Sequence, residues 1–163
     1  MKTSQIGIDL IKHFESLHDG DLKLVGLQPK MCPAGIWTEG YGRAMRDAKG
    51  NFLKGLANKK LAYNNAFINT EARANKALIE DLRAFELIVE RRIKVTISQG
   101  LFDALVSHVY NTGGSNTIFL MINAKSSVEI LKFWWISHYI TAKGNTKPLK
   151  GLVARRKSET KLF

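Results

Sequence analysis

One carboxylate, Glu15, closes a segment whose residue spacing is that of an amphipathic helix. Ser4 can cap the start of this helix, and Ile11 and Phe14 recur on its apolar face. Phe14 and Leu17 flank the carboxyl group and reduce its hydration, which favours the neutral, protonated form. These features fit a general acid, whereas an exposed Glu at a helix end is the structural alternative.

An eleven-residue run, 32–42, follows with the sequence Cys-Pro-Ala-Gly-Ile-Trp-Thr-Glu-Gly-Tyr-Gly. It contains a thiol, at Cys32, and a hydroxyl group, at Thr38. Its Pro and first Gly predict a turn. Trp37, Glu39 and Tyr41 then alternate with Thr38 and two glycines, which predicts a short strand. Glycines in a strand allow another chain to approach the backbone closely.

The run 32–42, together with Glu15 before it, resembles the phage-type lysozymes, the endolysin muramidases of glycoside hydrolase family 24. Residues 151–163, Gly-Leu-Val-Ala-Arg-Arg-Lys-Ser-Glu-Thr-Lys-Leu-Phe, are similar to the closing helix of that family. Residues 99–107 and the Tyr-Asn-Thr-Gly run at 110–113 are similar to its central helix and the following turn. The resemblance covers nearly the whole chain.

This resemblance implies a hydrolase of the β-1,4 linkage between N-acetylmuramic acid and N-acetylglucosamine in bacterial peptidoglycan. It implies Glu15 as the acid, with Cys32 and Thr38 as the other catalytic residues. Cys32 stands where many relatives carry Asp, so its action as base, as nucleophile or on the attacking water stays open. A buried, inert cysteine is the alternative.

Sugar binding is expected at Tyr41, Tyr110 and Asn111, because aromatic faces stack on sugar rings and amides hydrogen-bond N-acetyl groups. The four histidines, His13, His18, His108 and His138, are scattered, and no cysteine pair exists, so neither a metal site nor a cofactor is expected.

The sequence departs from the family pattern beside the expected site. The segment between Glu15 and Cys32 is longer than is typical, so 18–30 contains an inserted loop. Asp19 and Asp21 lie in this loop and could replace the missing Asp, although loop acids are usually solvated. Arg43, where relatives commonly have His, is expected to make the mouth of the site more cationic. Glu39 should point away from Thr38 and is interpreted as structural.

The remaining pattern predicts the elements that position these residues. Loop or hairpin is expected over 47–65, a long helix capped by Thr70 to about Arg92, and a helix opened by a Thr96–Gln99 capping box. Shorter helices are expected over 117–123 and 126–140, and a last one after Gly151. Trp134 and Trp135 should belong to the core, with at most one fully buried.

We therefore expect a single α+β, lysozyme-like domain over 1–163. A small strand-containing lobe, 15–65, would be joined to a larger helical lobe formed by 1–14 and 66–163, with a cleft between them.

The formal charge of +11 favours anionic partners, such as nucleic acid or a bacterial envelope. Basic residues gather late in the chain, where Lys143 and Lys147 precede the Arg155-Arg156-Lys157 cluster. A solvated face, adhesion to the envelope, and nucleic-acid binding are the open interpretations. We expect a monomer that acts on peptidoglycan rather than on nucleic acid; a wall-binding protein without catalysis is the other alternative.

One cysteine excludes an internal disulfide. No apolar run reaches the length of a membrane span, and charges interrupt the first residues, so no signal sequence is predicted. The expected location is the host cytoplasm, followed by the periplasm and cell wall at lysis.

Overall fold

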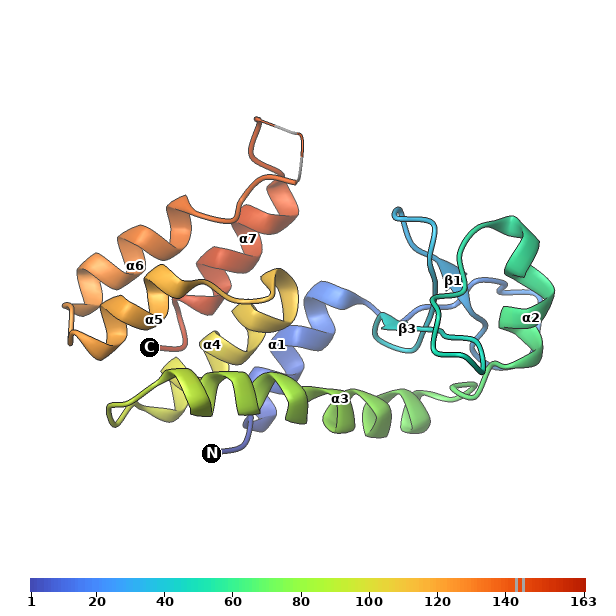
Figure 1. The fold of residues 1–163 in the computed structure, drawn as a ribbon, viewed down its shortest axis with the longest axis horizontal. Coiled ribbons are helices and arrows are strands. Elements are labelled where there is room, and N and C mark those ends of the chain that lie inside the picture. The colour runs from blue at the N-terminus through green and yellow to red at the C-terminus, as the bar shows by residue number, and fades with distance from the viewer. Residues whose placement is uncertain (143, 145) are drawn as a thin grey trace. The chain divides into compact units, whose positions relative to one another are not determined.

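A computed structural model describes residues 1–142, 144 and 146–163, so Lys143 lies outside the described residues. The described residues form helices and a small antiparallel sheet, which confirms the predicted α+β class. The helices, drawn in Figure 1, are α1 (Gln5–Glu15), α2 (Lys59–Asn64), α3 (Glu71–Arg92), α4 (Gln99–Thr112), α5 (Asn116–Asn123), α6 (Val128–Ser137) and α7 (Lys150–Glu159). None of these described helices is both long and apolar enough to cross a membrane.

The chain divides into two compact units. One contains Met1–Phe14 and Leu82–Phe163, and the other contains Glu15–Asp81. The division falls inside α3, which contributes its first half to one unit and its second half to the other.

The helical unit begins with α1, whose predicted cap is confirmed. The backbone N–H of Gly7 lies 3.4 Å from Ser4 Oγ, and the Ser4 hydroxyl donates to the buried Asp103 carboxylate on α4. Gly7 is required here because a Cβ at this position would lie 2.8 Å from Asp103. The first helix is therefore fixed to α4 at its start.

The start of α4 corrects a prediction. The N-cap is Ser98, whose Oγ accepts from the Leu101 N–H at 3.2 Å, so the Thr96–Gln99 capping box is wrong. The Gln99 amide instead donates to the Lys2 carbonyl and to Asp103. The end of α4 is as predicted, because Gly113 takes the left-handed conformation, φ 81°, that closes a helix.

Helix α6 is shorter than expected: it ends at Ser137 rather than near 140. The Ser137 hydroxyl donates to the Phe133 carbonyl, and His138 is extended, which stops the helix. Trp135 is fully buried and Trp134 is half-buried, which confirms the prediction that at most one would be enclosed.

The C-terminal helix α7 corrects the interpretation of the basic cluster. Arg155 and Arg156 are buried, and both pair with the buried Glu159. Ser107 and Trp135 also donate to this carboxylate, each at 2.7 Å. The Arg155-Arg156-Lys157 run is therefore not a continuous solvated face, and two of its charges cannot contact an external polyanion.

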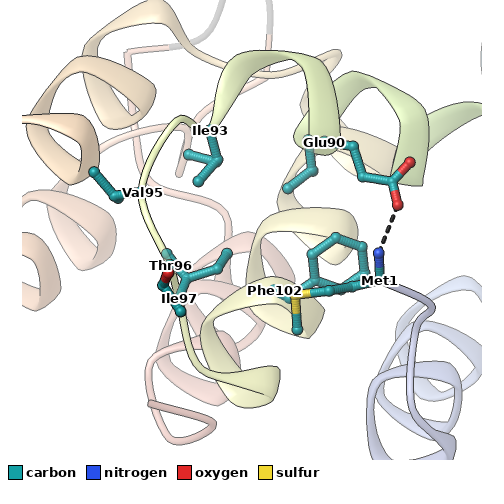
Figure 2. A pocket seen from close by; sticks show the side chains of 8 residues that line it. Met1, Glu90, Ile93, Val95, Thr96, Ile97 and Phe102 are labelled. Carbon is teal, nitrogen blue, oxygen red and sulfur yellow. Dashed lines mark hydrogen bonds and ion pairs between the residues drawn. The ribbon is translucent and has the colours of Figure 1, made fainter.

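The helical unit also contains a small apolar pocket of about 190 Å³ between the end of α3 and the start of α4. Figure 2 shows Ile93, Val95, Ile97 and Phe102 around it, with the Glu90 carboxylate paired to the Met1 amine at 2.6 Å.

The second unit contains a three-stranded antiparallel sheet in the order β1 (Lys30–Met31), β2 (Trp37–Glu39) and β3 (Arg43–Ala44). The strand β2 is shorter than the predicted alternation over 37–42. Gly40 and Gly42 have φ values of 59° and 87°, a left-handed conformation that ends β2 and turns the chain into β3.

A separate apolar core lies under this sheet. Trp37, Met45, Leu53 and Ala62 are buried together, and the Trp37 indole donates to the Gly55 carbonyl at 2.9 Å. The loop expected over 47–65 begins with a turn, in which the Asp47 carboxylate accepts the backbone N–H groups of Lys49 and Asn51.

Two helical segments in this unit were not predicted. They are a 3₁₀ turn, η1 (Leu56–Asn58), and the short helix α2 that follows it. Neither has a side-chain capping hydrogen bond, and the amide of Asn58, the N-cap residue of α2, instead donates to the Lys54 carbonyl at 2.7 Å. The predicted start of α3 is correct, since the Arg73 N–H bonds to Thr70 Oγ1 at 3.3 Å.

Candidate functional site

Glu15 is the last residue of α1 and is half-buried. Ser16 follows with φ 60°, a positive value that turns the chain sharply out of the helix. The backbone then returns to the sheet, where the His18 N–H donates to the Gly40 carbonyl at 2.8 Å. A Cβ built on Gly42 would lie 3.7 Å from Glu15 Oε2, so this glycine lies beside the acid.

The register of the sheet places the side chains of Lys30 and Thr38 on one face. Lys30 pairs with Thr38, and Thr38 pairs with Ala44. Cys32 follows directly after β1, and its backbone N–H donates to the carbonyl of Ile36, the residue before β2, at 2.8 Å.

The opposite face of β2 has a structural role. Trp37 belongs to the apolar core, and the Glu39 carboxylate accepts the N–H groups of Phe67 and Ile68 at 3.0 and 2.9 Å. Glu39 is therefore structural, as predicted, because its carboxylate fixes the segment before α3.

One pocket of about 650 Å³ collects the predicted catalytic residues within this unit. This volume is in the range that binds small ligands. Its polar lining is Glu15, His18, Lys30, Cys32 and Thr38, and its apolar lining includes Met31, Pro33, Ile36 and Ala44. Of the described residues in this lining, Glu15 is the one carboxylic acid.

His18 is the residue of this pocket that sequence reasoning missed, because it was counted among scattered histidines. Its Nδ1 lies 2.8 Å from Thr38 Oγ1. The Thr38 hydroxyl in turn donates to the Lys30 carbonyl at 2.9 Å. Burial, assisted by the positive charge of Lys30, lowers the pKa of His18, and the nearby Glu15 acts in the opposite direction. The available signal was its position three residues beyond Glu15.

The inserted loop does not bring a second acid into the pocket. The Asp19 carboxylate accepts the N–H groups of Asp21 and Gln28, so it organises the loop itself. Neither aspartate lines the pocket described above. A Cβ at Gly20 would lie 1.9 Å from the Pro29 carbonyl oxygen, so the two ends of the loop meet at a position where only glycine fits.

Arg43 does not contribute an unpaired positive charge, contrary to the prediction. Its guanidinium donates to both carboxylate oxygens of Asp81, at 2.8 and 2.9 Å, and to the Ala77 carbonyl. The hydrogen bond with Asp81 raises the pKa of Arg43. This side chain therefore fastens β3 to α3.

The predicted sugar-binding residues have different surroundings. Tyr41 is only 6% exposed, so it offers no open ring face in this structure. Tyr110 packs against Phe85, and the exposed Asn111 accepts from Arg156 at 2.9 Å. Tyr110 and Asn111 belong to the helical unit, and all three sugar-binding roles stay predictions.

No group of three or more metal-ligating side chains is placed to hold a metal ion among the described residues.

Comparison with known proteins assigns the family. The sequence profile of phage lysozymes matches residues 23–159, a range that begins after Glu15 and His18. The endolysin of Bacillus phage B103 is 32% identical over 171 residues, with 100% of this chain and 54% of the relative covered. The chain thus spans about half the length of that relative. The endolysin of Acyrthosiphon pisum secondary endosymbiont phage 1 is 29% identical, and 98% of its length is covered.

The solved structure of the endolysin from Escherichia coli O157:H7 phage FAHEc1 is similar in fold. It aligns with a TM-score of 0.71 and 30% identity, covering 99% of this chain and 92% of that one. The fold is lysozyme-like, as the sequence predicted. With most of its length matched by the profile, the chain belongs to the phage lysozyme family.

Proposed function

We propose that this protein is an endolysin that hydrolyses the β-1,4 linkage between N-acetylmuramic acid and N-acetylglucosamine in bacterial peptidoglycan. The observation that carries the proposal is the shared pocket of Glu15, Cys32 and Thr38, which come from the end of α1, the turn after β1 and the strand β2. Family membership supports the same substrate class.

Glu15 is proposed to protonate the glycosidic oxygen as the bond to the sugar carbon breaks. A half-buried carboxyl at a helix end, beside a glycine that leaves room for substrate, suits this role. Thr38 and Cys32 line the same pocket and are proposed to hold the attacking water.

The Glu15→Gln variant tests the acid, because the amide keeps the size of the side chain but cannot donate the proton. We expect release of reducing ends from purified Gram-negative peptidoglycan to fall by at least about 100-fold. Asp9→Asn, at an exposed position of the same helix, is the matched control and should keep full activity. Unchanged release by folded Glu15→Gln would contradict the assignment.

Cys32 is tested by two substitutions. If the thiol only holds water, Cys32→Ser should keep more activity than Cys32→Ala, since a hydroxyl makes the same kind of hydrogen bond. Loss of activity in both variants would indicate that the thiol itself reacts.

A wall-binding protein without catalysis is the second candidate, favoured by the single carboxylic acid among the described pocket residues. It predicts that the folded wild type sediments with peptidoglycan and releases no sugar ends. Nucleic-acid binding is disfavoured by the burial of Arg155 and Arg156.

A further inference from the structure

The hydrogen bonds around Thr38 fix the protonation of His18. The Lys30 carbonyl can only accept, so the Thr38 hydroxyl must donate its single proton to it. Thr38 Oγ1 can then only accept from the ring nitrogen 2.8 Å away, so His18 donates from Nδ1. A neutral ring protonated at Nδ1 carries its unshared electron pair on Nε2.

Among the described residues that line the pocket, the neutral imidazole is a better proton acceptor than the Cys32 thiol, whose sulfur accepts hydrogen bonds only weakly. Lys30 is a donor when charged, and the proton and one lone pair of the Thr38 hydroxyl are committed as described. Glu15 is the one carboxylic acid among the described residues of the lining, and its proton is needed for the leaving oxygen. A neutral imidazole can fill the role that a second carboxylate usually performs in glycoside hydrolysis.

From this arrangement we infer that His18 is a catalytic base of the pocket, whose Nε2 accepts the proton of the attacking water. The inference rests on the proposed function and adds a residue to it. As the water oxygen bonds to the sugar carbon, its proton passes to Nε2, while the Glu15 proton passes to the departing oxygen. The imidazolium then loses its proton to solvent, and Glu15 regains one.

The charged and polar groups that face His18 favour this role. Partial burial and the positive charge of Lys30 on β1 lower its pKa, which favours the neutral ring, while Glu15 at the end of α1 acts against them. Thr38 on β2 fixes the ring, and Cys32 lines the same pocket. A base that is neutral and oriented before substrate binds needs no rearrangement to accept the proton.

His18→Asn separates catalysis from positioning. The Asn amide can still donate an N–H to Thr38, but it has no counterpart of Nε2. We expect kcat for release of reducing ends to fall by at least about 100-fold with little change in KM. The acidic limb that protonation of His18 gives to the wild-type pH profile should disappear from the residual activity. His13→Asn, at an exposed position, is the matched control.

Release by folded His18→Asn within about threefold of wild type would overturn the inference and leave the proposed function intact. Failure of the wild type to release ends would overturn both together. If the variant does not fold, ¹⁵N NMR of the wild type at neutral pH decides: protonation at Nδ1 supports the inference, and protonation at Nε2 overturns it.

Discussion

The buried Glu159 changes how the basic residues beside it in the sequence are interpreted. The carboxylate is fully buried and accepts from Ser107, Trp135 and Arg156. Burial works to raise its pKa, but the hydrogen bonds and the charge of Arg156 outweigh burial, so the pKa of Glu159 is lowered. The charged form is therefore the stable one inside the helical unit.

Replacing Glu159 by Gln should destabilise the protein strongly. The variant removes the carboxylate that pairs with the fully buried Arg156 guanidinium, a loss that typically costs about 3–5 kcal/mol. Urea unfolding followed by circular dichroism measures the change. Glu129→Gln on the exposed side of α6 is the control and should lose much less stability than Glu159→Gln; similar midpoints for both variants would contradict the prediction.

Residue types and spacing were enough to single out Glu15, Cys32 and Thr38, because short motifs place them near one another in sequence. They could not identify His18 as a pocket residue, because its ring is held by a hydrogen bond to Thr38, which lies twenty positions later in the chain. Nor could they show that Arg156 is internal, since its partner His108 lies forty-eight positions away.

At the scale of elements, the caps were the features that local sequence described best. The Thr70 cap of α3 and the Gly113 end of α4 were predicted because their signals are adjacent to the helices they bound. The Thr96–Gln99 prediction failed because a second hydroxyl, Ser98, is closer to the first turn and Gln99 bonds elsewhere.

The competition between the two hydroxyls can be measured. Ser98→Ala removes the side chain that accepts the Leu101 N–H, and the loss of such a cap typically costs about 1 kcal/mol. Thr96→Ala should leave the free energy of unfolding nearly unchanged. Chemical denaturation of both variants tests this, and a larger loss in Thr96→Ala would restore the original capping box.

For the whole molecule, stability should fall as the pH drops below neutrality. Burial, with the positive charge of Arg156, lowers the pKa of His108 from 6.5, although Glu159 opposes the shift. Arg156 donates to its Nδ1 at 2.7 Å, so the folded ring is neutral. The unfolded chain therefore binds a proton below pH 6.5 that the folded chain rejects, which destabilises folding as pH decreases.

The expected slope from His108 is at most about 1.4 kcal/mol per pH unit, and His18 contributes in the same direction. His108→Asn keeps an acceptor for Arg156 but does not titrate. It should be less stable at neutral pH, yet lose less further stability between pH 6.5 and 5 than the wild type does. Urea titrations at several pH values test this, and parallel slopes would contradict it.

The distribution of tryptophan gives each compact unit its own optical reporter. Trp37 is buried in the core of the unit that contains the sheet, whereas Trp134 and Trp135 belong to the helical unit. These are the three tryptophans of the chain. Emission from a Trp37→Phe variant therefore reports the helical unit alone, and its difference from wild type reports the other. Intrinsic fluorescence can thus distinguish melting in one step from melting in two.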